Sequence, residues 1–294
     1  MILFPNAKIN IGLRVLRRRP DGYHDIESIF VPLPWCDVLE IVESENGQGS
    51  FNIIGEDILR LADDSDNLAM KAVRALESHI GRPLPPLDIY LSKRIPTGAG
   101  LGGGSADASF TIKGINELLG LGLDDATMAS IASKVGADCP FFIYNRPMLV
   151  RGTGDIMSAI EAPELDKLYV VAAKIAGTEV STREAYAGVT PREMTEGTDF
   201  AEAIRQEPGQ WTGLGLTNDF EESIFPRQPL VKELKERLAE PSCGCDYCLM
   251  SGSGSTVYGL FRSASAAENC AAALRQTYPG ADIFSGRLSS HPVV

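Results

Sequence analysis

The sequence lacks the features that mark several specialised classes of protein. No apolar stretch in its 294 residues approaches the ~20 residues that a membrane-spanning helix needs. Six cysteines are too few for a disulfide scaffold in a chain of this length. Hydrophobic residues at 44% and charged residues at 22% are ordinary for a globular protein, so a disordered or collagen-like chain is excluded.

Positive charge is also scarce. The chain has 27 Lys and Arg residues against 39 Asp and Glu residues, which gives a formal net charge of −12. The densest basic run, Arg17-Arg18-Arg19, is only three residues long. Because a surface this acidic repels nucleic-acid phosphates and anionic lipid, we expect no nucleic-acid or membrane partner. An anionic small-molecule substrate is still compatible with this charge, since a site needs only a few local cations.

The start of the chain and its cysteines bear on the compartment. Residues 1–8 do not show the basic start and apolar core of a secretory signal peptide, so we expect a cytoplasmic protein with reduced thiols.

The segment Cys243-x-Cys245-x-x-Cys248 places three thiols within six residues. Such a cluster binds zinc if a fourth ligand comes from elsewhere, but no second Cys or His pair has zinc-finger spacing, which favours reduced loop thiols.

Predicted helices and strands are mixed along the chain, which indicates an α+β or α/β fold. Apolar alternation and short apolar runs predict strands at 38–42, 51–54, 87–91, 168–173 and 256–261. Apolar residues at helical spacing predict helices at 66–80, 105–119, 124–135, 230–238 and 264–276. Asp66 is the predicted N-cap of the first of these helices, and Asp124 or Asp125 that of the third. The polar, glycine-containing segment 43–50 predicts a hairpin loop. A change in composition near 145–165 predicts two halves, 1–155 and 156–294.

The strongest local signal is a glycine-rich turn between a predicted strand and a predicted helix. Its eleven residues are Pro96, Thr97, Gly98, Ala99, Gly100, Leu101, Gly102, Gly103, Gly104, Ser105 and Ala106, and five of them are glycine. Glycine lets the backbone take positive φ angles and approach a ligand closely. Unpaired N–H groups at a helix start, together with the helix dipole, bind anions. This turn therefore predicts a phosphate site.

Two phosphate motifs nearly match this turn. Gly98-x-Gly100-x-x-Gly103 has the spacing of the dinucleotide fingerprint, which would suit an NAD-dependent oxidoreductase. That fingerprint needs a second parallel strand, whereas here a second predicted helix follows. The Walker A spacing also fits, except that Gly104 occupies the position of the required lysine. If the turn binds ATP, a cation from another part of the chain has to reach the transferred phosphate.

Other short segments carry groups suited to chemistry, although each has an ordinary interpretation. Lys8 alternates with apolar residues, which is usual for the solvated face of a strand. Asp138 precedes an apolar stretch, so it is either a cap or a site carboxylate paired with a lysine. A turn at Pro20–Gly22 presents Tyr23 and His24, one of only three histidines.

Taken together, these segments resemble the GHMP kinase superfamily. Three motifs carry the resemblance: residues 7–13, 96–108 and 250–261. In finer detail, Arg19–His24, the Gly-Leu-Gly-Gly-Gly-Ser loop, Gly136–Pro140 and Asn218–Glu221 resemble the branch of that superfamily that acts on 4-diphosphocytidyl-2-C-methyl-D-erythritol.

The resemblance implies two α/β domains with the site in the cleft between them. It also implies transfer of the γ-phosphoryl group of ATP, with Mg²⁺, to the 2-hydroxyl of that substrate, in the methylerythritol phosphate route to isoprenoid precursors. Lys8 and Asp138 would be the catalytic pair, with Lys8 as the cation absent at Gly104. The glycine-rich turn, from Pro96 to Ala106, would hold the phosphates of ATP. No protein ligand for Mg²⁺ is assigned, and Ser105 either contacts the ion or caps the helix.

The same resemblance implies that Tyr23 and His24 recognise the cytidine base, that Asn10 hydrogen-bonds the substrate near Lys8, and that Tyr186 stacks on the other face of the base. No obligate protein partner is evident from the sequence. Besides the oxidoreductase, two alternatives remain open: a GHMP kinase for another alcohol, and a nucleotide-binding module without catalytic activity.

Overall fold

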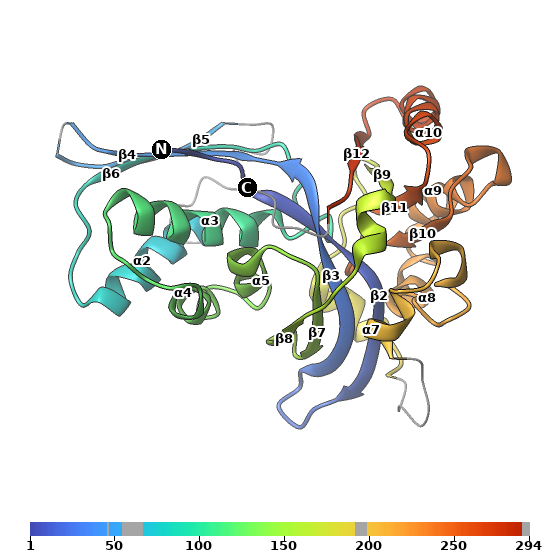
Figure 1. The fold of residues 1–294 in the computed structure, drawn as a ribbon, viewed down its shortest axis with the longest axis horizontal. Helices are drawn as coiled ribbons and strands as arrows, with labels where there is room; N and C mark the ends of the chain where they lie inside the picture. Colours follow the sequence, from blue (N-terminus) through green and yellow to red (C-terminus); the bar gives the residue numbers. More distant parts are fainter. Residues whose placement is uncertain (46, 55–66, 192–198, 290–294) are drawn as a thin grey trace.

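The computed structural model describes residues 1–45, 47–54, 67–191 and 199–289 (Figure 1). The strands of this part of the chain form three four-stranded sheets. The first sheet has the order β1 (Ile2–Leu3), β4 (Val38–Glu43), β6 (Leu87–Ser92), β5 (Ser50–Ile54). The second has the order β2 (Asn6–Arg18), β3 (His24–Cys36), β7 (Met148–Gly152), β8 (Ile156–Ala159). The third has the order β10 (Tyr247–Met250), β11 (Val257–Phe261), β9 (Tyr169–Lys174), β12 (Asp282–Arg287).

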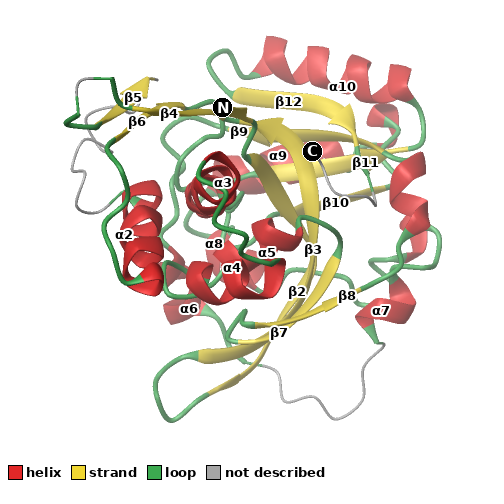
Figure 2. Cartoon of the chain, turned by 60° about the vertical axis from the view of Figure 1, so that its left-hand side comes forward, coloured by secondary structure: helices red, strands yellow, loops and turns green. Residues whose placement is uncertain are grey.

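Helices cover these sheets at both ends of the molecule (Figure 2). The helices between β5 and β7 are α2 (Leu68–Ile80), α3 (Gly103–Leu118), α4 (Asp125–Ala132) and α5 (Cys139–Tyr144). Those after β9 are α6 (Thr182–Gly188), α7 (Phe200–Ala203), α8 (Phe220–Ile224), α9 (Pro229–Leu238) and α10 (Ala264–Thr277). Short 3₁₀ turns occupy η1 (Pro163–Lys167), η2 (Pro208–Gln210) and η3 (Pro241–Cys243). None of the helices described is both long and apolar enough to cross a membrane.

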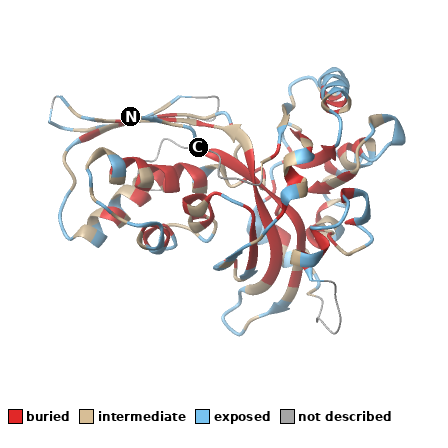
Figure 3. Ribbon diagram, in the orientation of Figure 1, coloured by how far each residue is buried: buried red, intermediate tan, exposed pale blue. Residues whose placement is uncertain are grey.

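The long strands β2 and β3 run through the middle of the molecule and are covered on both faces (Figure 3). On one face, Phe30 joins a core with the helices α2 to α5. On the other face, Ile9, Ile11 and Ile29 join a core that reaches the third sheet. Burial on both faces favours a nearly continuous run of buried positions, and Asn6 to Leu13 are all buried. The middle sheet therefore connects the two halves of the fold.

The five predicted strands and the five predicted helices are all present, with shifted ends. α2 is capped by Asn67, whose side chain accepts from the Ala69 N–H; the predicted cap, Asp66, lies outside the described residues. α3 begins at Gly103, before the predicted start. α4 has the predicted cap Asp124 but ends at Ala132. Three of the strands that sequence patterns did not predict are β7, β8 and β12.

The predicted hairpin between β4 and β5 is wrong. β6 lies between these two strands, antiparallel to β4 and parallel to β5. The alternating side chains of β6 explain its central place, because Leu87, Ile89 and Leu91 are all buried. β5 lies at the edge, where Ile54 is exposed.

The fold also bears on the oxidoreductase alternative and on the domain boundary. After the glycine-rich turn, α3 leads to α4 and α5, and the next strand, β7, pairs antiparallel with β3 in another sheet. The second parallel strand of a dinucleotide-binding unit is therefore missing at this point in the described chain.

The predicted boundary between the two halves of the chain, at 155/156, falls in the turn of the β7–β8 hairpin and stays a prediction.

One hydrogen bond links the middle and third sheets directly. The buried Tyr258 hydroxyl on β11 donates to the backbone oxygen of Asn10 on β2 at 2.7 Å. Tyr258→Phe removes this donor and leaves the buried carbonyl unpaired, so we expect the free energy of unfolding to fall by about 1–3 kcal/mol. Urea denaturation measures the loss. The matched control is Tyr90→Phe at an exposed position of β6, with an expected change within ~0.5 kcal/mol. Equal effects of the two changes would contradict the linking role.

Candidate active site

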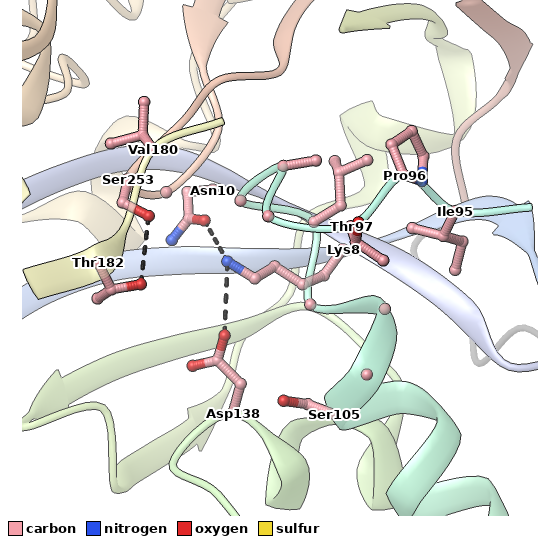
Figure 4. A pocket seen from close by; sticks show the side chains of 18 of the residues that line it. Lys8, Asn10, Ile95, Pro96, Thr97, Ser105, Asp138, Val180, Thr182 and Ser253 are labelled. Atoms are coloured by element: carbon pink, nitrogen blue, oxygen red, sulfur yellow. Dashed lines mark hydrogen bonds and ion pairs between the residues drawn. The ribbon is translucent and has the colours of Figure 1, made fainter. Parts of the chain in front are cut away.

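A cavity of about 480 Å³ lies where the two halves of the fold meet (Figure 4). β2 supplies Lys8 and Asn10, and the start of α5 supplies Asp138. From the C-terminal half come Thr182 and Tyr186 of α6, with Gly252 and Ser253 from the turn between β10 and β11. Every residue of the glycine-rich turn from Pro96 to Ser105 also lines the cavity. Of the predicted ATP-binding residues, only the buried Ala106 is not among the lining residues.

The Lys8 side chain is almost fully buried, with an exposed fraction of 4%. Its Nζ donates to Asn10 Oδ1 at 2.5 Å, lies 3.7 Å from Asp138 Oδ2 and sits 4.5 Å from the centre of the Phe30 ring. Burial lowers the pKa of the Lys8 ammonium from its usual value, while the charge and hydrogen bond of Asp138 act in the opposite direction. The ordinary interpretation of Lys8, a lysine on a solvated strand face, is wrong.

Asp138 precedes α5, but its side chain makes no capping hydrogen bond to that helix. The carboxylate points into the cavity toward Lys8, with an exposed fraction of 34% (Figure 4). Its 3.7 Å separation from Lys8 Nζ is an ion pair rather than a short hydrogen bond. The carboxylate can therefore accept a further donor from a molecule bound in the cavity.

Asn10 is held in place by its own partners. Its Nδ2 donates to Ser28 Oγ at 2.9 Å, and the Ser28 hydroxyl donates to the backbone oxygen of Gly12 at 2.6 Å. These bonds fix the orientation of the side chain, so that Asn10 Oδ1 faces Lys8. Lys8 therefore has a fixed acceptor on one side and a partly exposed carboxylate on the other.

The glycine-rich turn is held between β2 and the turn 251–256. The Lys8 backbone N–H donates to Leu101 O at 2.9 Å, and the Ser251 hydroxyl donates to Gly100 O at 2.9 Å. Thr256 N donates to Ala99 O at 3.2 Å. Gly100 has a φ of 73°, and a Cβ at this position would lie 2.1 Å from Ser251 O. Glycine is therefore required here both for the backbone angle and for the close approach of Ser251.

The N-terminus of α3 opens into the same cavity. The helix begins after Gly102, which has a φ of 70°, and no side chain caps it. The first N–H groups of a helix have no intrahelical partner, so they and the helix dipole attract an anion. Ser105 does not cap α3 but lines the cavity, and its hydroxyl points to the side on which Asp138 lies (Figure 4).

Sequence reasoning missed a second buried lysine beside the turn. Lys93, after β6, pairs with Asp107 at 2.7 Å and with Asp37, and both carboxylates are buried. Nothing in its local sequence distinguishes Lys93 from a surface lysine, because its two partners are distant in the chain. Its ammonium also lies close to the turn, 3.5 Å from where a Gly103 Cβ would be.

Tyr23 and His24 do not line the first cavity but an adjoining hollow of about 980 Å³. The two spaces share Ile26, Asp138, Thr182 and Tyr186. The His24 ring stacks on Tyr186 with 4.9 Å between ring centres and an angle of 18° between planes. Burial, with a smaller effect of the Asp138 charge, raises the pKa of Tyr186 to about 12. Burial and the charge of Arg18 lower the pKa of His24.

Within the described residues, no group of three or more His, Cys, Asp and Glu side chains is placed to hold a metal ion. That statement covers Cys243, Cys245 and Cys248, all of which are free thiols. Oxygen donors for an ion bound together with a ligand are nevertheless present, because Ser105 and Asp138 both line the cavity.

The close approach of Gly100 to Ser251 leads to a stability prediction. Gly100→Ala adds a methyl group against backbone, whereas Gly120→Ala adds one in open space at a similar φ of 59°. Both changes have the left-handed penalty of about 1–2 kcal/mol. Only Gly100→Ala has a further overpacking cost of about 1–3 kcal/mol. Thermal or urea unfolding of the two variants compares them directly, and equal losses would contradict the packing of the turn.

Comparisons with known proteins find relatives that match most of the chain. Residues 67–146 match the model of the GHMP kinases N terminal domain, and residues 200–280 match that of GHMP kinases C terminal. A relative from Parabacteroides distasonis, named 4-diphosphocytidyl-2-C-methyl-D-erythritol kinase, is 46% identical over 261 residues, which are 89% of this chain and 92% of the relative. The Geobacter sp. strain M21 relative of the same name is 40% identical over 94% of both chains.

Solved structures agree with these matches. A crystal structure of 4-(cytidine 5'-diphospho)-2C-methyl-D-erythritol kinase superposes with a TM-score of 0.77 at 30% identity, covering 98% of this chain and 99% of that one. A mevalonate kinase structure superposes with a TM-score of 0.67 at 16% identity, covering 98% and 99%, and shows the shared two-domain fold alone. The chain therefore belongs to the GHMP kinase superfamily and, within it, to the family of 4-diphosphocytidyl-2-C-methyl-D-erythritol kinases.

Proposed function

We propose that this protein transfers the γ-phosphoryl group of ATP to the 2-hydroxyl of 4-diphosphocytidyl-2-C-methyl-D-erythritol, a step in the methylerythritol phosphate route to isoprenoid precursors. The observation that carries the proposal is the position of the Lys8–Asp138 pair. It lies where the cavity at the uncapped start of α3 meets an aromatic-lined hollow. A phosphoryl donor on one side and an alcohol acceptor on the other would meet at this pair.

The donor side is the glycine-rich turn. Its backbone N–H groups and the N-terminus of α3 would hold the phosphates of ATP. Phosphoryl transfer depends mainly on positioning and on stabilising charge on the transferred group. Gly104 offers no cation. The Lys8 side chain lines the same cavity as the turn, and its Cγ lies 3.2 Å from where a Gly102 Cβ would be. Lys8 would supply the missing positive charge.

Asp138 would position the substrate hydroxyl and accept its proton. Its carboxylate is partly exposed, makes no capping bond and belongs to both the cavity and the hollow. General base assistance of this kind contributes about 10²–10⁴-fold in rate. Orientation of the hydroxyl by the carboxylate adds to that effect, because the reacting atoms have to be in line.

Mg²⁺ is part of the proposal as the ion that accompanies ATP. Ser105 and Asp138 are the oxygen donors in the cavity that would hold it, which fits an ion that usually takes one or two protein ligands with phosphates and waters. When bound, Mg²⁺ neutralises charge on the phosphate oxygens. The residues of the chain provide the remaining functions, which are binding, orientation and acceptance of the proton.

The acceptor side is the hollow lined by Tyr23, His24 and Tyr186. Aromatic rings suit the flat face of a pyrimidine, and the ring nitrogens of His24 suit its polar edge. Asn10, fixed by Ser28, would contact the substrate beside Lys8. A GHMP kinase for a small alcohol has no need for this hollow, which favours the cytidylated substrate over another alcohol.

The predicted cytoplasmic location and the absence of an obligate partner belong to the same proposal. All six cysteines are free thiols, which suits a reducing compartment. A small-molecule kinase of this kind needs no nucleic acid or membrane for its reaction.

The direct test is ADP release from Mg-ATP with two acceptors: the cytidylated methylerythritol and the same alcohol without its CMP group. We expect turnover with the first and little with the second, because the hollow binds the base. Tyr23→Ala should raise the KM for the cytidylated acceptor roughly 5- to 100-fold through lost stacking, with the KM for ATP unchanged.

Tyr90→Ala, at an exposed position on β6, is the matched control and should leave both KM values unchanged. ATP binding without turnover of either acceptor would contradict the proposed substrate and leave a GHMP kinase for another alcohol or a non-catalytic nucleotide-binding module. An equal rise in the KM for ATP in Tyr23→Ala would contradict the assignment of the hollow to cytidine.

A further inference from the structure

The cysteine cluster near the C-terminus forms two separate thiol pairs. Cys245 and Cys248 each shift the pKa of the other thiol, and Cys243 and Cys270 do the same, so the members of each pair lie close together. Each thiol is free. The segment from Cys245 to Cys248 has the Cys-x-x-Cys spacing, which in a reducing compartment is typical of a redox or metal site. Among the described residues, no group of three or more His, Cys, Asp and Glu side chains is placed there to hold a metal ion. Of the two kinds of site, the redox site is therefore the one considered for this pair.

The local backbone brings the first pair together. The chain bends at Asp246, and the Cys245 thiol folds back to donate to Tyr247 O at 2.9 Å. Cys248 is on β10, directly opposite Gly259 of β11. A Cβ on Gly259 would lie 3.0 Å from Cys245 Sγ, so glycine at this position provides the space that the Cys245 sulfur occupies. Both thiols are half-buried and therefore reachable by a small molecule.

The two thiols of this pair have opposite electrostatic environments. The Cys245 side chain and the nearby ammonium of Lys235 lower the pKa of Cys248, against the effects of burial and of Glu221. The Cys248 side chain and burial raise the pKa of Cys245. Among the six cysteines, Cys248 is the one whose pKa is lowered; burial is the first cause that raises the pKa of Cys36, Cys139, Cys243 and Cys270.

We propose that Cys245 and Cys248 form a thiol–disulfide exchange site, in which Cys248 attacks a low-molecular-weight disulfide and Cys245 resolves the product into an intramolecular disulfide. The placement of both residues beside Gly259, the bend at Asp246 and the partial exposure of the two thiols carry this inference. It is independent of the kinase reaction, because neither thiol lines the active-site cavity.

The step balances with oxidised glutathione as the co-reactant. The Cys248 thiolate attacks one glutathione sulfur, the S–S bond breaks, and one reduced glutathione leaves with the bonding pair. Cys245 then loses its proton to solvent and its sulfur attacks Cys248, which releases the second reduced glutathione. Two cysteines lose two electrons in total, and one small disulfide gains them.

The test is to incubate the folded protein with oxidised glutathione, block free thiols by alkylation and map the cysteines by mass spectrometry. In the unchanged protein we expect a Cys245–Cys248 disulfide, seen as the loss of two hydrogens and reversed by dithiothreitol. Cys245→Ser should stop at a glutathione adduct on Cys248. Cys248→Ser should form neither product. Cys36→Ser is the matched control and should behave as the unchanged protein does.

Kinase activity of each variant confirms that it is folded, since these cysteines do not touch the active-site cavity. The proposal is overturned if the unchanged protein bridges Cys243 to Cys270 instead, or if all six thiols stay alkylatable. It is also overturned if Cys245→Ser accumulates glutathione on other cysteines in preference to Cys248.

Discussion

A buried ammonium group cannot be left without partners, and the arrangement around Lys8 meets this constraint. The side chain lies in the middle of the fold, where removal from water is costly unless charge and hydrogen bonds compensate. Asn10 supplies a fixed acceptor, Phe30 an aromatic face and Asp138 a counter-charge. Each partner comes from a different part of the sequence, so the two long central strands and the start of α5 have to meet for Lys8 to be stable. The same meeting point is where the two halves of the kinase fold enclose the cavity.

The glycine-rich turn depends on the same region. Its backbone is bonded to β2 at Leu101 and to the turn before β11 at Gly100, so both halves of the fold hold it in place. A loop fixed at both sides presents its N–H groups in a defined arrangement, which reduces the reorganisation that binding a phosphate would require. Glycine at position 100 is what permits the close approach of Ser251. Lys8 and the turn are thus parts of one packed unit.

Local sequence patterns were sufficient for much of this structure. The apolar periods located five strands and five helices, and the glycine-rich turn with its flanking elements indicated a phosphate site before any coordinates. The motifs also indicated the superfamily, which the comparisons confirm. Strand order was not accessible in the same way: β6 follows β4 and β5 in the chain but pairs between them, and its buried face shares a core with α2 and α3, which local patterns do not reveal.

Some site residues could not be predicted from local sequence because their partners are distant in the chain. Lys93 reads as a surface lysine until Asp37 and Asp107 are seen beside it. The stack of His24 on Tyr186 joins residues far apart in the chain, and only the resemblance suggested that both belong to one site.

The most direct test of the account is to measure nucleotide affinity and turnover together in Lys8→Met. Methionine keeps an unbranched apolar side chain against Phe30 and removes the charge. If Lys8 stabilises the transferred phosphoryl group, turnover falls roughly 100- to 1,000-fold. The affinity for ATP changes much less, because the backbone of the turn still binds the phosphates, and the variant remains folded. Turnover close to that of the unchanged protein would contradict the central role of the buried lysine.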